Sequence, residues 1–148
     1  MLVKPGKINI IIDGQFGSTG KGTISAYLAL KNHIDIFVSN LSPNAGHTYD
    51  IGDGPKVVKQ IPVGSTFNKR SQIYLSAGSI IDPTQLLTEL EKFDIDCDRV
   101  CIHPHASVIT NDDILTEKDN NSSVTKIAST QSGTGVALSN KILRKAKL

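Results

Sequence analysis

A run of β-branched residues leads into a glycine-rich loop near the start of the chain, and this junction constrains the fold more than any other feature. Residues 8–12 read Ile-Asn-Ile-Ile-Ile, and Gly17, Gly20 and Gly22 then surround Lys21. A short apolar run bounded by glycines is typical of a buried strand that enters a loop. The sequence therefore predicts a strand at residues 8–12 that ends in a glycine loop.

The residues after this loop have the spacing of a helix, and a second β-rich run follows them. Ile24, Tyr27, Leu28 and Lys31 recur at helical intervals, and residues 34–38 read Ile-Asp-Ile-Phe-Val. A strand, a helix and a second strand form a βαβ unit, whose parallel crossover is nearly always right-handed. We therefore expect an α/β fold with a mainly parallel central sheet, flanking helices and a P-loop-like phosphate-binding loop.

The rest of the chain continues this alternation of strands and helices. Asp82 and Pro83 are a capping residue and a first-turn proline, so they predict a helix over residues 84–90. Further strands are expected at residues 57–61, 73–75, 99–102 and 107–109, an irregular loop at 40–51, a polar surface segment at 116–123 and a basic helix over 141–147.

Length and composition fit one globular domain and exclude several classes of protein. The 148 residues carry a net charge of +2, and aromatic residues make up 5% with no Trp. This balance argues against disorder and against a nucleic-acid partner, which would need a basic surface or aromatic platforms for bases. The sequence has no apolar run of membrane-spanning length and no secretory signal, so we expect no membrane partner and a cytoplasmic location.

The two cysteines and two neighbouring histidines do not form a recognisable metal site. Cys97 and Cys101 have no second pair with which to complete a tetrahedral zinc site. We expect both thiols to be inert core residues next to a strand. His103 and His105 flank Pro104 and have no evident third ligand, so we interpret them as structural.

The glycine loop has a physical reason to bind phosphate. Without Cβ atoms, backbone N–H groups can converge on an anion, while the helix N-terminus and Lys21 supply positive charge. The strict P-loop motif is absent, because Gln15 stands where its first glycine should be and Gly22 separates Lys21 from Thr23. A turn that merely joins strand to helix is the alternative, although such a turn has no need of three glycines and a lysine.

A second polar constellation follows the second expected strand. Residues 43–48 read Pro-Asn-Ala-Gly-His-Thr, and loops at the carboxyl edge of a parallel sheet lie side by side. The ordinary pKa of histidine, about 6.5, lets His47 donate or accept a proton near neutrality. Taken alone, His47 is an ordinary surface residue; beside a phosphate loop it is a candidate catalytic group.

These two motifs together resemble the adenylosuccinate synthetase family. That family has Gln-Trp-Gly-Asp-Glu-Gly-Lys-Gly where this chain has residues 15–22, and Asn-Ala-Gly-His-Thr at residues 44–48. The resemblance continues through residues 61–64, 77–83 and 127–133, so it covers essentially the whole chain. It implies a ligase that joins L-aspartate to position 6 of a purine nucleotide, driven by ATP or GTP with Mg²⁺, through a 6-phosphoryl intermediate.

The resemblance also implies roles for individual residues. His47 assists phosphoryl transfer, Gly46 offers a carbonyl to Mg²⁺, and Arg144 reaches a nucleotide phosphate in a neighbouring subunit, which implies a homodimer. The triphosphate is held by Gly17, Ser18, Thr19, Gly20, Lys21, Gly22, Thr23, Gly46, His47 and Thr48, and the nucleotide monophosphate by Ser18, Asn44, Ala45, Ser129, Thr130 and Arg144.

One departure from the family pattern bears on the choice of substrate. Ser18 replaces the family aspartate that removes the N1 proton and binds Mg²⁺, and serine is not a comparable base. The smaller side chain leaves room for a purine 2-amino group, as in guanine. Gly-Ser-Thr-Gly-Lys-Gly, together with Asp13 two residues before the glutamine, resembles the bacteriophage N6-succino-2-amino-2'-deoxyadenylate synthases of this family. We therefore expect dGMP as the purine deoxynucleotide, with host cytoplasm as the location of a phage protein.

Several alternatives remain open at this stage. Asp13 is a candidate for the missing base, for selection of the 2-amino group or for support of the loop. An ordinary IMP-using synthetase and a nucleotide-binding module without catalysis are the competing functions. Because family members are more than twice as long, we expect residues 1–148 to be the N-terminal nucleotide-binding portion of a longer domain.

Overall fold

Three parallel strands form the central sheet of the protein, in the spatial order β1, β4, β6. The structure is a computed structural model that describes residues 3–15, 17–119 and 130–148. An antiparallel pair, β2 with β3, and a short parallel pair, β5 with β7, complete the strands. In chain order the elements are α1 (Lys21–Lys31), β1 (Ile36–Ser39), β2 (His47–Tyr49), β3 (Lys56–Val58), a 3₁₀ turn η1 (Val63–Thr66), β4 (Gln72–Leu75), β5 (Ile80–Ile81), α2 (Pro83–Lys92), a 3₁₀ turn η2 (Cys97–Arg99), β6 (Val100–Ile102), β7 (Ser107–Val108), α3 (Asn111–Asp119) and α5 (Thr134–Ile142).

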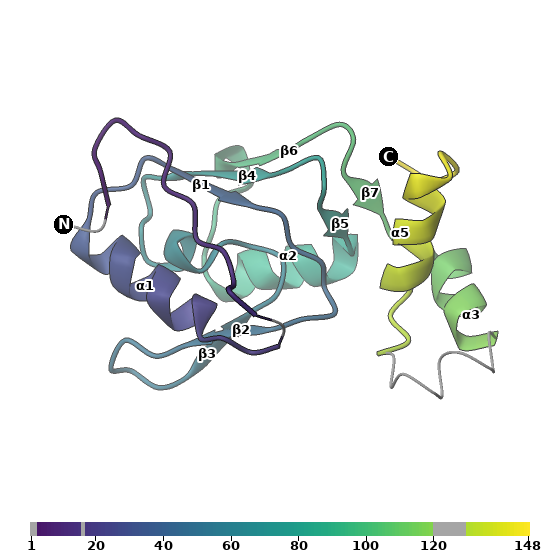
Figure 1. Ribbon diagram of the computed structural model, residues 1–148, viewed down its shortest axis with the longest axis horizontal. Coiled ribbons are helices and arrows are strands. Elements are labelled where there is room, and N and C mark those ends of the chain that lie inside the picture. The colour runs from purple at the N-terminus through teal and green to yellow at the C-terminus, as the bar shows by residue number, and fades with distance from the viewer. Residues whose placement is uncertain (1–2, 16, 120–129) are drawn as a thin grey trace.

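One face of the central sheet packs against α1 and α2. Ile73 and Leu75 of β4 are completely buried, in the same apolar cluster as Ala26 of α1 and Leu86 and Leu90 of α2. Figure 1 shows the three strands above and both helices below them. The predicted α/β fold with a parallel sheet and flanking helices is therefore confirmed.

Helix α2 begins where local sequence signals place it. The Asp82 side chain accepts a hydrogen bond of 3.0 Å from the backbone N–H of Gln85, and Pro83 is the first helical residue. Such a cap satisfies an N–H that has no acceptor within the helix. The predicted strands near residues 73–75, 99–102 and 107–109 also form, as β4, β6 and β7.

The predicted buried strand at residues 8–12 is wrong. Ile8, Ile10 and Ile12 are 91%, 76% and 81% exposed, and the backbone of residues 8–12 is not hydrogen-bonded to the backbone of any other described residue. A strand is stable only beside a neighbour that pairs its backbone groups. None of the described strands pairs with residues 8–12, so the expected βαβ unit through them does not form.

Four further expectations differ from the structure. The loop predicted at residues 40–51 contains β2, and the polar segment predicted at 116–123 begins inside α3, while its residues 120–123 lie outside the described residues. The helix expected over 141–147 ends at Ile142. Cys97 and Cys101 are both exposed, not buried, because η2 and β6 turn them away from the core cluster.

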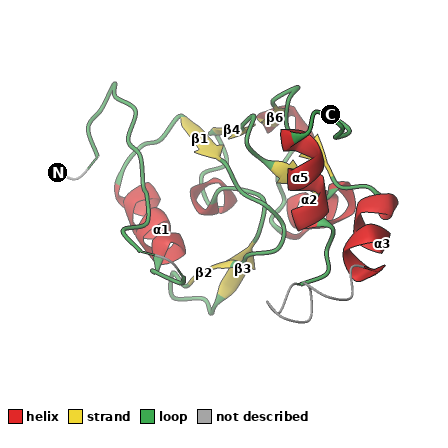
Figure 2. Cartoon of the chain, turned by 45° about the vertical axis from the view of Figure 1, so that its right-hand side comes forward, coloured by secondary structure: helices red, strands yellow, loops and turns green. Residues whose placement is uncertain are grey.

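A second, smaller group of elements lies at the C-terminal end of the described chain. Helices α3 and α5 pack together next to β5 and β7 around Ile80, Ile109 and Ala137 (Figure 2). The ammonium group of Lys141 in α5 donates hydrogen bonds to the backbone carbonyls of Ala77 and His105. These bonds tie α5 to the loops that follow β4 and β6.

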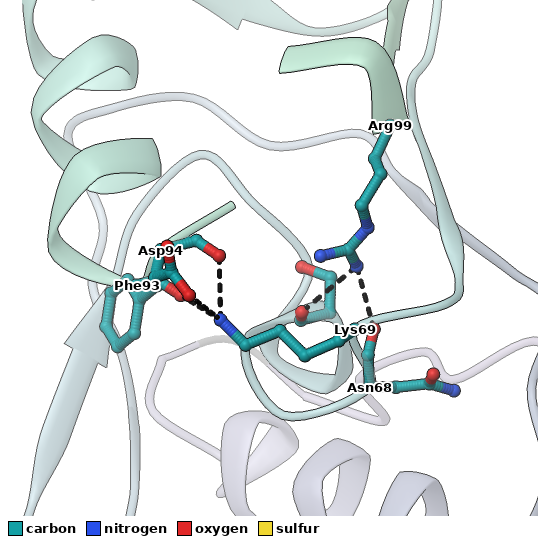
Figure 3. A network of polar contacts seen from close by, with 6 residues as sticks. Asn68, Lys69, Phe93, Asp94 and Arg99 are labelled. Carbon is teal, nitrogen blue, oxygen red and sulfur yellow. Dashed lines mark hydrogen bonds and ion pairs between the residues drawn. The ribbon is translucent and has the colours of Figure 1, made fainter. Parts of the chain in front are cut away.

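Arg99 and Lys69 make polar contacts at the end of the central sheet where β4 and β6 begin. The Arg99 guanidinium donates to the carbonyl of Asn68 at 2.7 Å, and Lys69 pairs with Asp94 at 2.8 Å (Figure 3). Arg99 also donates to the carbonyl of Ser71 at 2.9 Å. Burial lowers the pKa of Arg99 from its ordinary value. A hollow of about 570 Å³ beside these residues is lined by side chains of both charges, so it offers no uniform field for an anion.

Candidate functional site

The glycine loop ends at the N-terminus of α1, as the sequence predicts. Gly17 and Gly20 adopt φ angles of 91° and 76°, a region that other residues rarely occupy, and Gly20 is the N-cap of the helix. No side chain caps this helix. Lys21, Gly22 and Thr23 form its first turn, where backbone N–H groups lack acceptors within the helix. The loop thus combines N–H groups that lack intrahelical acceptors with one lysine, and this combination suits an anion.

Gly22 brings the two sequence motifs into one site. A Cβ atom on Gly22 would lie 2.8 Å from the carbonyl oxygen of Thr48 and 3.3 Å from Cβ of His47. The hydroxyl of Thr23 also lies 3.5 Å from the Thr48 oxygen, to which it donates. Only a glycine lets α1 approach β2 this closely. The expectation that the two loops are neighbours is therefore confirmed.

Replacing Gly22 with alanine should separate the two motifs and destabilise the protein. The new methyl group would meet the β2 backbone, which cannot rotate away, so we expect a loss of about 1–3 kcal/mol in the free energy of unfolding. Urea unfolding measures this loss. Gly14→Ala is the matched control, because a Cβ atom there meets nothing within 4 Å. Equal stability of the two variants would show that the contact is not tight.

Asp13 lies against the glycine loop. Its carboxylate accepts hydrogen bonds from the Lys21 ammonium and the Thr19 hydroxyl. Both bonds favour the charged carboxylate, and the one to Lys21 has the larger effect in lowering the pKa of Asp13 below its ordinary value. The carboxylate is therefore ionised at neutral pH and holds Lys21 over the loop. Asp13 thus pairs with the lysine that the sequence assigns to phosphate.

His47 is partly buried in β2, close to these charges. Burial lowers its pKa most, and the nearby positive charge of Lys21 lowers it further, while Asp13 and Glu89 act in the opposite direction. The net effect places the pKa of His47 below its ordinary value of 6.5. The imidazole is consequently neutral at pH 7, with one ring nitrogen able to donate and the other able to accept a hydrogen bond.

An NMR titration of His47 tests this electrostatic arrangement. The midpoint should lie below 6.5 in the wild-type chain, fall further in Asp13→Asn, where a favourable negative charge is lost, and rise in Lys21→Met, where a repulsive positive charge is lost. The resonances of His33, which lies outside the site, should respond to neither substitution. A His47 midpoint that neither variant moves would mean that Asp13 and Lys21 do not lie near the imidazole.

Glu89 belongs to the structure around this site, and the sequence analysis did not identify it. Its buried carboxylate accepts hydrogen bonds from the backbone N–H groups of Lys59, Gln60 and Ile61, directly after β3, the strand that pairs with His47. A signal was present: Glu89 lies three residues after Leu86 and one before Leu90, on the buried face of α2. A charged residue at such a position needs buried partners.

The remaining predicted residues fall into two groups. Ser18 and Thr19 lie in the exposed glycine loop, and Asn44, Ala45 and Gly46 lie in the exposed segment between β1 and β2. Thr130 precedes α5 and Arg144 follows it, on the other side of the molecule from α1 (Figure 1). The structure does not bring these two residues to the loop, and Ser129 lies outside the described residues.

The oxygen donors around the loop fit a magnesium ion with bound phosphates. Mg²⁺ takes oxygen ligands and is commonly held by one or two carboxylates together with substrate phosphates. The Asp13 carboxylate, the Thr19 hydroxyl and the Gly46 carbonyl are groups of this kind. Within residues 3–15, 17–119 and 130–148, no three His, Cys, Asp or Glu side chains cluster as a metal site. His103 and His105 therefore have no third such ligand beside them among these residues. None of the described helices has the length and hydropathy of a membrane span.

Comparison with known proteins identifies relatives that match this chain over the region that contains both motifs. The family model of adenylosuccinate synthetase matches residues 10–147. The N6-succino-2-amino-2'-deoxyadenylate synthase of Vibrio phage phiVC8 is 38% identical over 141 residues, which are 93% of this chain and 40% of that protein. The adenylosuccinate synthetase of Pyrococcus horikoshii is 34% identical over 142 residues, which are 93% of this chain and 41% of that protein.

Two solved structures resemble this fold. One is the succinoaminodeoxyadenylate synthetase of Cyanophage S-2L, bound to dGMP and to dATP as an energy donor; its TM-score is 0.75 at 33% identity, over 90% of this chain and 37% of that one. The other, adenylosuccinate synthetase from Plasmodium falciparum, has a TM-score of 0.77 at 24% identity, over 89% of this chain and 32% of that one, and supports the fold alone. The chain thus spans about two fifths of the length of its curated relatives.

Proposed function

Because the chain belongs to the adenylosuccinate synthetase family, we propose that it supplies the phosphate-binding part of a ligase that joins L-aspartate to position 6 of dGMP. The observation that carries this proposal is the contact of Gly22 with Thr48 and His47, because it unites a phosphate-binding helix N-terminus with a neutral imidazole. Residues 1–148 are then the N-terminal nucleotide-binding portion of the full ligase, and a homodimer would let Arg144 reach a phosphate in a neighbouring subunit.

The proposed reaction has two steps. The terminal phosphoryl group of the triphosphate passes to O6 of the purine, which releases a nucleoside diphosphate and the N1 proton. The aspartate amino group then attacks C6 and loses a proton, with phosphate as the leaving group. Lys21 and the N–H groups of the first turn of α1 bind the triphosphate, and neutral His47 donates a hydrogen bond toward the transferring oxygen. Mg²⁺, to which Gly46 would offer its carbonyl, would neutralise phosphate charge when bound.

Ser18 is the residue that favours dGMP over IMP. The family aspartate at this position is larger and charged, whereas a serine leaves space where guanine carries its 2-amino group.

The cyanophage neighbour binds dGMP and uses dATP as an energy donor. We therefore favour an adenine triphosphate, ATP or dATP, over GTP as the co-substrate here.

Asp13 has the three candidate roles that the sequence leaves open, and its contacts favour one of them. Bonds to Thr19 and Lys21 orient the loop, whereas a proton acceptor for the purine would need a free carboxylate. We infer that Asp13 supports the loop and holds Lys21 until phosphate replaces it. Asp13→Asn should then weaken triphosphate binding, while unchanged dGMP turnover and affinity would exclude a role for this carboxylate.

Mass spectrometry of the products tests the function. The chain, aspartate and Mg²⁺ are incubated with dGMP, GMP or IMP, each crossed with ATP, dATP or GTP, with and without the remaining part of a curated relative. A succinyl adduct of dGMP supports the proposal. An adduct of IMP alone indicates an ordinary adenylosuccinate synthetase, and bound nucleotides without any adduct indicate a binding module.

The substitution Ser18→Asp tests the basis of substrate choice. The carboxylate should crowd the purine 2-amino group, so we expect dGMP binding to weaken by about tenfold or more while IMP binding is spared. Calorimetric titration of both nucleotides measures this, with IMP as the internal control. An unchanged preference for dGMP would remove Ser18 from the explanation.

A further inference from the structure

A second hollow, of about 230 Å³, lies between α2 and the end of β3. Helix α2 lines it with the residues at positions 85, 88, 89 and 92, whose spacing of three and four places them along one face of the helix. The other wall is made by Val57 of β3 and by Lys59, just after that strand. These six residues define what is here called the α2–β3 hollow, and none of them belongs to the glycine loop or to the His47 motif.

Gln85 contributes to this hollow a buried acceptor that the described chain does not use. Its side-chain Oε1 atom is shielded from solvent and has no hydrogen-bond partner among the described residues. The start of α2 does not need this side chain, because Asp82 caps the helix through the backbone N–H of Gln85. An unpaired buried acceptor costs free energy, which a hydroxyl or amine donor from a bound ligand would recover.

Two lysines give the α2–β3 hollow an excess of positive charge. Within the part of the chain that the structure describes, no carboxylate pairs with the ammonium group of Lys59 or Lys92. Glu89 is the one carboxylate in the lining, and both of its oxygens accept hydrogen bonds from backbone N–H groups directly after β3. Two unpaired cations beside one carboxylate that is already hydrogen-bonded attract an anion.

We propose that the α2–β3 hollow binds a small hydroxylated phosphomonoester, at a site separate from that of the triphosphate. A phosphomonoester carries a charge of about −1.5 to −2 at pH 7, which the ammonium groups of Lys59 and Lys92 match. A hydroxyl of the same ligand donates to Oε1 of Gln85. The hollow is smaller than the pockets of ~300–1,000 Å³ that take drug-sized ligands, so it suits a compound of a few carbon atoms and not a nucleotide. This site is independent of the proposed ligase function.

An NMR titration of the ¹⁵N-labelled chain with glycerol 3-phosphate tests this proposal. The side-chain amide of Gln85 and the backbone amide of Thr88 report on the hollow, while the backbone amides of Lys21 and Gly22 report on the triphosphate site. We expect saturable shifts at Gln85 and Thr88, weaker binding of methyl phosphate, which lacks the hydroxyl, and no binding of glycerol, which lacks the anion. No shifts, shifts confined to Lys21 and Gly22, or equal binding of glycerol would overturn the proposal.

Substitution of one lysine makes the test specific to the hollow. Lys59→Met should weaken glycerol 3-phosphate binding by at least about tenfold, the value of a charge-assisted hydrogen bond. Lys56→Met is the matched control, since Lys56 lies in the same strand, pairs with Asp53 and does not line the hollow. Equal affinities of these two variants would contradict the proposal. Lys21→Met should bind glycerol 3-phosphate as the wild-type chain does, so a failure of the triphosphate site is distinguishable from a failure of this one.

Replacing Gln85 with leucine separates ligand binding from a structural role of this side chain. Gln85→Leu should weaken glycerol 3-phosphate binding by about three- to tenfold and remove the preference for it over methyl phosphate. The urea midpoint of this variant should not fall, because the Oε1 atom that it loses has no partner in the described chain. A lower urea midpoint, or a retained preference for glycerol 3-phosphate, would show that Gln85 does not await a ligand donor.

Discussion

Replacing Glu89 with alanine is expected to lower the free energy of unfolding by roughly 3–5 kcal/mol, because it leaves two buried and one partly buried backbone N–H groups without an acceptor. These groups belong to Lys59, Gln60 and Ile61, and they connect α2 to the end of β3. Thermal and urea unfolding of the variant measure the loss. The geometry of the site should also be disturbed, since β3 pairs with the strand that carries His47.

Glu91→Ala is the matched control for Glu89. Glu91 lies on the exposed side of the same helix, and a surface substitution of this kind usually changes stability by no more than about 0.5 kcal/mol. Glu89→Gln, which retains one acceptor oxygen and similar shape, should fall between the two. If Glu89→Ala is as stable as Glu91→Ala, the carboxylate does not hold the end of β3.

Replacing Lys21 with methionine is expected to weaken triphosphate binding by roughly 10- to 150-fold, the value of one charge-assisted hydrogen bond to phosphate. Lys21 is the first residue of α1. Among the described residues it is the one cation of the glycine loop. Fluorescence titration with an adenine nucleotide analogue measures the change. Lys31→Met, in the last turn of α1, is the control and should bind as the wild-type chain does.

The contact between Lys21 and Asp13 adds a second comparison. In Lys21→Met the Asp13 carboxylate is left without its cation and repels phosphate. The double variant Asp13→Asn/Lys21→Met should therefore bind triphosphate better than Lys21→Met alone, although less tightly than the wild-type chain. Wild-type affinity in the single variant Lys21→Met would contradict the assignment of the loop to phosphate.

Local sequence signals predicted the helices whose starts are marked by capping residues. Asp82 and Pro83 fix the start of α2, and Gly20 fixes the start of α1, because caps act within a few residues of the chain. The adjacency of the two motifs was also predicted, but residues 8–12 form no strand, so the motifs meet through the contact of α1 with β2 and not at a shared sheet edge. The need for glycine at position 22 was not, because it depends on the Thr48 oxygen, which lies far away in sequence.

Features that depend on distant partners escaped the sequence analysis. Strand β2 forms inside a polar segment because Lys56–Val58 pairs with it. Residues 8–12 have the composition of a buried strand, yet burial needs a neighbour that the described chain does not supply. Cys101 follows the same rule, since it is exposed although it lies in β6. Composition indicates which segments could be buried, but burial also requires a neighbouring segment that packs against them.

The central claim is that the glycine loop and the His47 motif form one triphosphate site, and amide NMR of the labelled chain tests it most directly. Addition of dATP with Mg²⁺ should shift the amide resonances of Lys21, Gly22 and Thr23 together with those of Gly46, His47 and Thr48, and leave those around Lys69 and Arg99 unmoved. Shifts confined to the hollow beside Lys69 and Arg99, or no shifts at millimolar nucleotide, would contradict the claim.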